Sequence, residues 1–333
     1  MSFSRAYPFL VLLFVLTWSS AFPAAKLAIS TCPPALFLGI RFLLAAALLL
    51  GAAAFTQGLQ GIPWRRLALI GLVNQAGYQG LSWIGMTTVS AGLATIVTSL
   101  NPILVAVLAA PLLGETLTRR KLAGVVLGFA GAAFIVRDHL AWGADPVGVL
   151  ALFGALASVV AGTLAFKRLV PPEIPLLTAV GAQQAAAGAA LLAAGLLSED
   201  TRAIHLGVTF YLLMAWFVGV VSIGAFLLWF LLLRRGTASS ATALHFLMPP
   251  TGLVMSWAAL GEPLHLLDLL GVVPIGVGIW LTTQAGRAAV TASPGRRLWL
   301  RPAWSTPTSA RFAGSEARRS SDPVHSSSNA PPR

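Results

Sequence analysis

The sequence is poor in charged residues. Only 10% of its 333 residues are Asp, Glu, Lys or Arg, against about 25% in typical soluble domains. Hydrophobic residues make up 57% of the chain, and the mean hydropathy is +0.82. A soluble protein of this size needs more charged side chains to cover its surface. The composition therefore excludes an ordinary soluble protein and indicates one that crosses a membrane several times.

Cysteine and the common catalytic motifs are also scarce. The single cysteine, Cys32, excludes an intrachain disulfide and a cysteine-based metal cluster. The chain contains no His-Glu-x-x-His, no Gly-x-Ser-x-Gly and no P-loop sequence. We therefore expect a protein that is not an enzyme and that needs neither a cofactor nor a metal.

Ten apolar stretches are long enough to cross a bilayer, which takes about 20 helical residues each. They lie near residues 8–27, 34–55, 67–86, 91–113, 121–137, 146–166, 175–197, 208–233, 238–260 and 264–283. The first resembles a secretory signal, but it is long enough to span and is followed by a poor cleavage site, so we interpret it as an uncleaved helix. The sequence predicts an all-α membrane protein with ten transmembrane helices.

The 22 basic residues are distributed unevenly between the two sides of this arrangement. With the N-terminus in the cytoplasm, 18 of them fall on the cytoplasmic side, and Lys26, Arg137 and Arg202 fall on the other. Basic connections stay preferentially in the cytoplasm, so both termini are predicted to be cytoplasmic. Eight arginines belong to residues 287–333, a Ser-, Pro- and Ala-rich stretch that predicts a disordered basic tail. The net charge of +12 is thus no indication of nucleic-acid binding.

The two halves of the chain share a repeated sequence. Residues 91–131 align with residues 238–278 at a constant offset of 147, and 15 of the 41 positions are identical. Apolar helices use few residue types and therefore often match by chance. Chance does not readily explain three matched pairs, which are Pro102/Pro249, Gly114/Gly261 and Glu115/Glu262. We predict two five-helix repeats, residues 1–142 and 143–286. Because five is odd, the second repeat enters the membrane from the opposite side, as in many secondary transporters.

These motifs carry a resemblance to a known family. The first half contains Phe22-Pro-Ala-Ala-Lys26, Gly39-Ile-Arg41-Phe42, Ser90-Ala-Gly-Leu-Ala-Thr, Asn101-Pro102 and Leu113-Gly114-Glu115. The second half contains Ala238-Ser-Ser-Ala-Thr-Ala, Pro249 and Leu260-Gly261-Glu262. Over residues 8–283 the chain resembles the EamA-type, ten-helix branch of the drug/metabolite transporter superfamily. The resemblance implies a bacterial membrane transporter, since members export amino acids, other metabolites or toxic compounds, and some take up substrates.

The third predicted span carries the densest set of polar side chains. At α-helical spacing they form one polar and aromatic face, and the second half has no equivalent face at offset 147. We interpret this face as one wall of a substrate cavity, and the alternative is hydrogen bonding between packed helices. The cavity candidates on this span and on neighbouring ones are Asn74, Gln75, Tyr78, Gln79, Trp83, Thr98, Asn101 and His245.

Prolines in the fourth and ninth spans predict hinges beside this cavity. A proline inside a helix frees the carbonyl four residues earlier and kinks the helix. Pro102 is then expected to free the carbonyl of Thr98, and Pro249, which is followed by Pro250, that of His245. The alternative is a fixed kink required for packing.

Charged and titratable groups inside the spans are few. Arg41 is the only formal charge deep within one, and it is either a contact for an anionic substrate group or a structural residue. The second half has Gln183 and Gln184 in the equivalent region. No acidic residue lies mid-span, so His245 is the candidate for proton coupling, unless it is a hydrogen-bonded core residue. Gly114, Glu115, Gly261 and Glu262 form a structural motif in which each carboxylate is expected to cap a nearby helix N-terminus, with a gating salt bridge as the alternative.

The sequence therefore predicts a secondary transporter of small metabolites in the bacterial cytoplasmic membrane. Export of amino acids or related compounds is what the family resemblance implies. Its expected partners are a small-molecule substrate and the lipid bilayer, with a monomer or homodimer as the assembly. A passive facilitator, an uptake carrier and a non-transporting membrane sensor or assembly partner are the alternatives.

Overall fold

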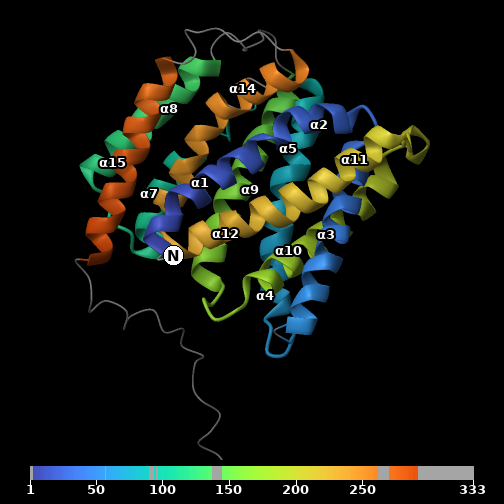
Figure 1. Cartoon of the computed structure of the whole chain (residues 1–333), viewed down its shortest axis with the longest axis horizontal. Coiled ribbons are helices and arrows are strands. Elements are labelled where there is room, and N and C mark those ends of the chain that lie inside the picture. The colour runs from blue at the N-terminus through green and yellow to red at the C-terminus, as the bar shows by residue number, and fades with distance from the viewer. Residues whose placement is uncertain are drawn as a thin grey trace, which may run out of the picture. The chain divides into compact units, whose positions relative to one another are not determined.

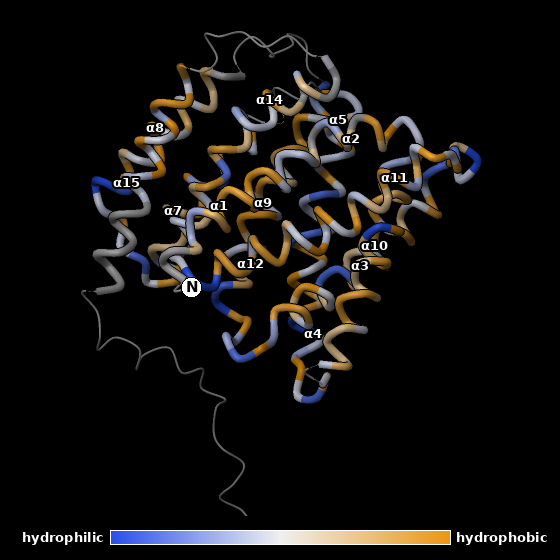
Figure 2. Tube along the Cα trace, viewed as in Figure 1, coloured by the Kyte–Doolittle hydropathy of each residue, from blue (hydrophilic) through white to orange (hydrophobic). Residues whose placement is uncertain are grey.

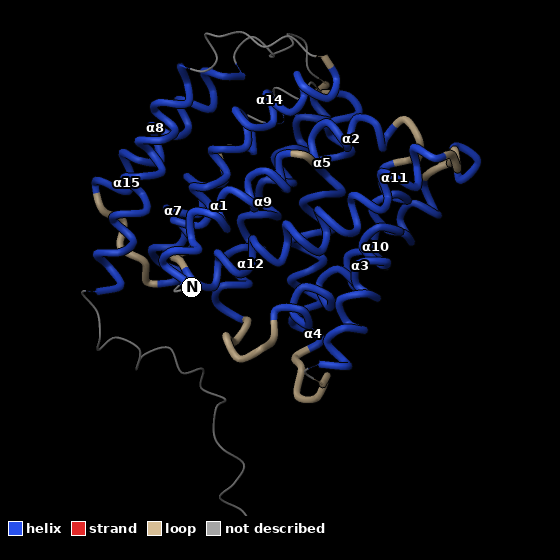
Figure 3. The backbone as a smooth tube through the Cα atoms, viewed as in Figure 1, coloured by secondary structure: helices blue, strands red, loops and turns tan. Residues whose placement is uncertain are grey.

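The computed structural model describes residues 3–56, 58–89, 94, 97–98, 100–136, 145–261 and 270–291. These ranges form helices joined by short turns and contain no strand (Figure 3). The chain divides into two units, Met1–Val290 and Thr291–Arg333. All helices below belong to the first unit, apart from the last residue of the final helix. Residues 287–291 of the predicted basic tail belong to the last helix, and residues 292–333 lie outside the described residues.

The helices are numbered in chain order in Figure 1. The first half contributes α1 (Phe3–Ser19), α2 (Ala21–Ile29), α3 (Pro34–Thr56), α4 (Trp64–Gly71), η1 (Leu72–Gly80), α5 (Leu81–Thr88), α7 (Asn101–Leu113) and α8 (Arg119–Val136). The second half contributes α9 (Pro146–Leu169), α10 (Leu176–Ser198), η3 (Thr201–Ala203), α11 (Val208–Trp216), η4 (Phe217–Ala225), α12 (Phe226–Arg235), α13 (Ala238–Ala243), η5 (Leu244–Leu247), α14 (Met248–Leu260) and α15 (Val272–Thr291).

Five of these helical segments are long and apolar enough to cross a membrane. They are Ala6–Ile29, Pro34–Thr56, Pro146–Leu169, Leu176–Ser198 and Val208–Arg235. Apolar residues run along the helices, and hydrophilic residues gather at many of their ends (Figure 2). The fold is therefore all-helical and has the character of a membrane protein, as predicted. The described residues of the other five predicted spans also lie on helices, which are shorter, broken or less apolar.

Glycines join α3 to α10 along an antiparallel seam. A Cβ atom on Gly39 would lie 2.6 Å from the backbone N of Leu192, and one on Gly181 would lie 2.9 Å from Leu50. Farther along, Gly195 packs against Leu36, so residue numbers rise on one helix as they fall on the other. Both helices have 23 residues, and the Gly39–Leu192 and Gly181–Leu50 contacts occupy reciprocal positions in them. Small residues allow such close approach of two membrane helices.

A second glycine seam joins α8 to α15. Gly124 lies against the carbonyl of Gly278, and Gly131 lies against the carbonyl of Gly271, with a Cβ atom expected at 2.6 Å from the oxygen in each case. The predicted repeat pairs Gly124 with Gly271 and Gly131 with Gly278. Each of these two contacts is therefore the repeat counterpart of the other.

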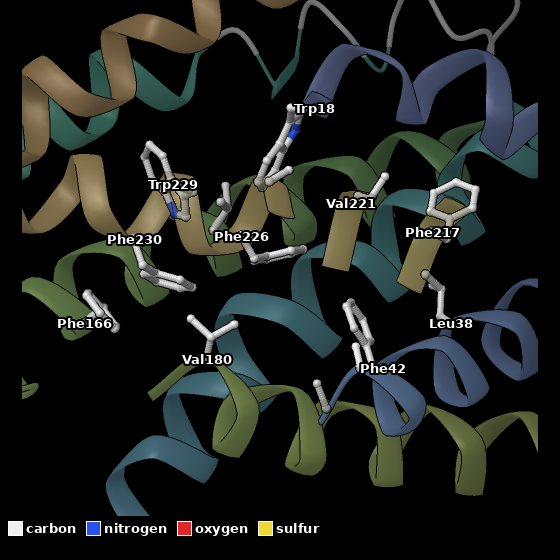
Figure 4. Close-up of a cluster of buried hydrophobic side chains, with 14 of the residues drawn as sticks. Trp18, Leu38, Phe42, Phe166, Val180, Phe217, Val221, Phe226, Trp229 and Phe230 are labelled. Atoms are coloured by element: carbon white, nitrogen blue, oxygen red, sulfur yellow. The ribbon is translucent and has the colours of Figure 1, made fainter. Parts of the chain in front are cut away.

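The helices of the two halves interleave. The first long helix of the second half, α9, packs against η1, α5 and α7 of the first half. Correspondingly, α1 of the first half packs against η4 and α14 of the second half. The buried core is thus shared, and Figure 4 shows its aromatic centre, to which α1, α3, α9 and α12 contribute side chains.

The helices that carry the predicted prolines also correspond. Both α7 and α14 have 13 residues, and their bounds differ by the offset of 147. Each ends at a glycine in the left-handed region, with φ of 69° at Gly114 and 70° at Gly261. Glycine adopts this conformation without a Cβ penalty and is the usual residue just after a helix end.

Candidate functional site

The polar third span is continuous but is not α-helical throughout. Its middle, η1, is a π-helix of nine residues between α4 and α5. The predicted face assumed 3.6 residues per turn, and its members within η1 differ in their surroundings. Asn74 packs against Gly162 of α9, whereas Gln75 is fully buried and has no hydrogen-bond partner on either amide atom. π-Helical segments are frequent at functional sites, and the eighth predicted span contains one at the matching place, η4.

The later residues of the predicted wall are partly exposed. Tyr78 and Gln79 are half-buried, whereas Trp83 is buried. The Trp83 ring stacks on Phe37 with 6.0 Å between centroids and meets the edge of Phe217 at 5.9 Å. Trp83 therefore connects the third span to α3 and η4 through an aromatic cluster.

Arg41 lies beside this cluster and is 1% exposed. Its Nε donates a hydrogen bond to the Ser222 hydroxyl at 3.1 Å. Its guanidinium carbon lies 4.5 Å from the ring centroid of Phe42 and 4.8 Å from that of Phe217. On the same serine, the backbone carbonyl accepts a hydrogen bond from Gln184 Nε2 at 2.5 Å. Helices α3, η4 and α10 therefore meet at one buried polar point.

His245 lies in a separate aromatic environment. Its ring meets Trp229 edge-on at 4.6 Å, and the rings of Phe14 and Trp18 are both 5.8 Å away. Its Nδ1 is 3.1 Å from the carbonyl of Thr242. In Figure 4, Trp18, Phe226 and Trp229 lie close together, and Phe217 is farther along the same row. The ring contacts therefore place Trp83 and His245 in two separate aromatic clusters.

Thr98 and Asn101 lie at the start of α7. The Thr98 hydroxyl donates to the carbonyl of Ala94 at 2.8 Å, and its side chain is half-buried. Asn101 is 1% exposed, and its Oδ1 has no hydrogen-bond partner. Asn101 is thus a buried polar group available for a further contact.

The predicted prolines begin helices instead of kinking them. Pro102 lies in the first turn of α7 and Pro249 in the first turn of α14, with Pro250 next to it. The ninth predicted span is broken into α13, the 3-10 helix η5 and α14. The expectation of a free carbonyl at His245 is wrong, because this carbonyl accepts the N–H of Met248 in a 3-10 turn. A proline is well tolerated at such a helix start, where its missing N–H costs nothing.

Glu115 caps a helix of the other half. Its carboxylate accepts hydrogen bonds from the N–H of Ala238 at 2.6 Å and from the Ser239 hydroxyl at 2.7 Å, both at the start of α13. It also pairs with Lys121 Nζ at 2.7 Å. The predicted cap is therefore present, but on α13 rather than on the next helix along the chain, and the ion pair accompanies it. Glu262 lies outside the described residues.

The turn between α12 and α13 is held from a second side. Lys167 Nζ, on α9, donates to the carbonyls of Leu233 and Gly236, each at 2.6 Å. A cation at the C-terminal end of a helix satisfies its free carbonyls and its dipole. Glu115 and Lys167 thus fix the end of α12 and the beginning of α13.

Two groups in the connections have shifted pKa values. Hydrogen bonds from the N–H of Gly148, the side chain of Thr88 and the N–H of Val147 lower the pKa of Asp145, which caps α9. Burial, aided by the Glu199 carboxylate, raises the pKa of Cys32 to about 11. Within the described ranges, no group of three His, Cys, Asp or Glu side chains could hold a metal ion.

Several polar and aromatic residues of these clusters were not among the predicted site residues. Ser222 is the offset-147 counterpart of Gln75, so the repeat alone could have drawn attention to it. The paired amides Gln183 and Gln184 are visible as polar residues inside an apolar span. Trp18 and Trp229 give no such signal, because aromatic residues at helical spacing are usual in a core.

Comparison with known proteins identifies the family of this helical fold. The model of the EamA-like transporter family matches the chain twice, over residues 6–137 and 146–284. The chain belongs to the EamA-like transporter family. The two matches coincide with the two halves defined above and together cover nearly all of the described helices. Family membership points to a multi-pass membrane transporter rather than an enzyme.

Named relatives of this EamA-like protein are transporters. It is 30% identical to "Uncharacterized transporter YvbV" of Bacillus subtilis, over 84% of this chain and 92% of the relative. It is also 30% identical to "Probable terminal-alkyne amino-acid exporter" of Streptantibioticus cattleyicolor, over 89% and 100%. "Probable amino-acid metabolite efflux pump" of Salmonella typhimurium is 26% identical, over 87% and 98%.

A solved structure shares the fold of this EamA-like protein. It is titled "Crystal structure of protein" and matches with a TM-score of 0.72 at 20% identity, over 84% of this chain and 97% of the other. At this identity the match supports the helical arrangement alone.

Proposed function

We propose that this EamA-like protein is a secondary transporter that exports amino acids or related metabolites across the bacterial cytoplasmic membrane. Transport follows from family membership, and the export of amino acids is drawn from the names of two relatives. The basic residues concentrated on one side of the predicted topology support an inner-membrane protein with both termini in the cytoplasm.

Alternating access requires two halves that can exchange conformations. Residues 1–142 and 143–286 are the proposed inverted five-helix repeats. The observation that carries this proposal is the reciprocity of the glycine contacts. Gly39–Leu192 and Gly181–Leu50 exchange under a two-fold operation, and so do Gly124–Gly278 and Gly131–Gly271. An antiparallel pairing of equivalent helices is what an axis in the membrane plane produces.

The proposed substrate path runs between the two π-helical segments η1 and η4. Both lie at the middle of their spans. η1 packs against α3 and α10, and η4 packs against α3 and accepts a hydrogen bond from Gln184 of α10. Polar groups without partners include both amide atoms of Gln75, on η1, and Oδ1 of Asn101, at the start of α7. Pro102, Pro249 and Pro250 stand where helices restart, which supports their proposed role as hinges.

Flux through proteoliposomes tests the proposal. Vesicles containing the purified protein are loaded with each of the 20 L-amino acids in turn, and efflux is followed with and without a pH gradient. Saturable, substrate-specific efflux supports a transporter, and accumulation against a gradient supports coupling. The absence of flux for the whole amino-acid panel and for a wider metabolite panel would remove the transport function.

The same measurement separates the alternatives. A passive facilitator equilibrates its substrate but does not accumulate it under any ion gradient. An uptake carrier concentrates substrate on the cytoplasmic side, which oriented vesicles reveal. A sensor or assembly partner binds ligand without flux.

A further inference from the structure

The charge of Arg41 is buried without a counter-ion. Among the residues that the structure describes, no acidic side chain pairs with it. A buried charge is costly unless an opposite charge or a full set of hydrogen bonds compensates it. The side chain is 1% exposed, so water cannot supply that compensation in this conformation.

One edge of the guanidinium lacks a hydrogen-bond partner. The rings of Phe42 and Phe217 lie 4.5 and 4.8 Å from its central carbon, and its Nε donates to the Ser222 hydroxyl. The Nη2 atom is buried and has no hydrogen-bond partner. A guanidinium edge of this kind binds a planar carboxylate through two parallel hydrogen bonds.

Buried amide groups on α10 and η1 also lack hydrogen-bond partners. Gln184 is anchored through Nε2 to the Ser222 carbonyl, which leaves its Oε1 buried and unpaired. Gln75 is buried on η1, which packs against α10, and neither of its amide atoms is paired. Free amide oxygens are acceptors. They suit an ammonium group placed near a carboxylate.

We propose that Arg41, held by Ser222 and assisted by Gln184, is the subsite that binds the α-carboxylate of an amino-acid substrate at the interface of the two halves. The one positive charge of Arg41 pairs with the one negative charge of an α-carboxylate, which leaves the substrate ammonium to neutral amide oxygens. The Gln184 amide oxygen accepts from the substrate ammonium. This inference rests on the proposed transport function and adds the substrate group that is recognised.

The asymmetry of the repeat explains why one half alone provides this contact. In the two 23-residue helices α3 and α10, the position of Arg41 corresponds to that of Gln183. The Gln183 amide donates to the carbonyl of Ala179 on its own helix. The substrate carboxylate is therefore expected to stay bound to Arg41 of α3 in both conformations of the transporter. The segments η1 and η4 exchange their conformations around it.

Thermal unfolding of the purified protein with matched ligand pairs tests the subsite. The probes are the 20 L-amino acids and their α-carboxamides, which keep size and ammonium group but lack the negative charge. We expect at least one amino acid to raise the unfolding temperature, because a ligand that binds the folded state stabilises it. Its carboxamide is expected to bind about 10- to 100-fold more weakly, as for the loss of charge-assisted hydrogen bonds.

Substitutions locate the effect at Arg41. Arg41→Gln should weaken the amino acid about as much as amidation does, and should make the acid and the carboxamide bind alike. Ser222→Ala keeps the charge of Arg41 but removes the hydrogen bond that orients its guanidinium. This change should weaken binding of the amino acid more than binding of the carboxamide. The control is Thr178→Val on α10, a fully buried and nearly isosteric change, which should leave the preference for the acid intact.

Several results would overturn the subsite. Equal stabilisation by an amino acid and its carboxamide in the wild-type protein would do so, as would stabilisation by none of the 20 amino acids. A preference for the acid that survives in both Arg41→Gln and Ser222→Ala would place recognition elsewhere. If Arg41→Gln does not fold, Ser222→Ala alone decides. Flux in proteoliposomes is measured separately, so binding without flux contradicts transport but not the subsite, and flux without a preference for the acid contradicts the subsite alone.

Discussion

Gly39 and Gly181 occupy reciprocal positions in the seam between α3 and α10. A Cβ on Gly39 would lie 2.6 Å from the backbone N of Leu192, and one on Gly181 would lie 2.9 Å from Leu50. The backbone at Leu192 cannot retreat without moving α10. The seam therefore depends on the missing side chain at position 39.

Replacing Gly39 with alanine should destabilise the protein. The added methyl group overpacks the seam, which costs about 1–3 kcal/mol. Gly51→Ala in the same helix is the matched control, because no atom lies within 4 Å of its added Cβ, and it should be neutral or stabilising by up to about 1 kcal/mol. Equilibrium unfolding in mixed micelles, followed by tryptophan fluorescence, measures both. Equal stability of the two variants would contradict the close approach of α3 and α10.

Removing the Glu115 carboxylate should destabilise the protein. Glu115→Gln leaves the Lys121 ammonium without its partner, and both side chains are nearly buried, with 10% and 3% exposed. The loss of one member of a buried pair costs about 3 kcal/mol. The double variant Glu115→Gln/Lys121→Met removes both charges and should be more stable than Glu115→Gln alone. Additive losses in this double-mutant cycle would show that the two residues do not interact.

Asp145 should make a pH-dependent contribution to stability. The Gly148 N–H, the Thr88 side chain and the Val147 N–H hold the pKa of its carboxyl group below the ordinary value. A folded pKa lower than the unfolded one means that the contribution is complete above the unfolded pKa of about 3.9. It is lost as the pH falls through the folded pKa. Asp145→Ala should therefore unfold at a lower temperature than wild type at pH 7, and the gap should narrow below pH ~4. A gap that stays constant down to pH ~3 would exclude this linkage.

The helices were predictable because the bilayer fixes their length. The predicted spans 34–55 and 175–197 agree with α3 and α10 to within about two residues, since each is a continuous apolar run of the required length. The repeat at offset 147 also predicted that α7 and α14 correspond. Both features depend on local composition and on spacing along the chain.

The site was less predictable because it depends on contacts between distant residues. The polar face of the third span was predicted with 3.6 residues per turn. No residue pattern in the sequence indicates the π-helical turns of η1. Arg41 was identified as the one charge deep in a span, but its partner Ser222 lies 181 positions later. Glu115 was expected to cap a helix, and only the tertiary arrangement selects α13.

Gln79 tests whether the third span lines the substrate path. Its side chain is half-buried, so Gln79→Leu keeps the size and removes the hydrogen-bonding amide. If Gln79 contacts the substrate, the Michaelis constant for flux should rise about 5- to 10-fold, which corresponds to the loss of about 1 kcal/mol for one hydrogen bond. The neighbouring π-helical residue Val73 is 41% exposed, and Val73→Leu should leave the kinetics unchanged. Unaltered kinetics in Gln79→Leu would remove this residue from the path.

His245 is the remaining candidate for coupling transport to protons. The Thr242 carbonyl can only accept a hydrogen bond, so Nδ1 carries its proton and Nε2 is left to take up another. The rings of Phe14, Trp18 and Trp229 surround the imidazole with centroids 5.8, 5.8 and 4.6 Å away, and an aromatic ring attracts a cation through its face. If His245 couples transport to protons, His245→Gln should abolish stimulation of flux by a pH gradient and preserve flux without one. His205→Gln, a change at an exposed histidine in a connection, should retain the stimulation. Because glutamine cannot titrate, stimulation that survives in His245→Gln would show that the proton moves through another group.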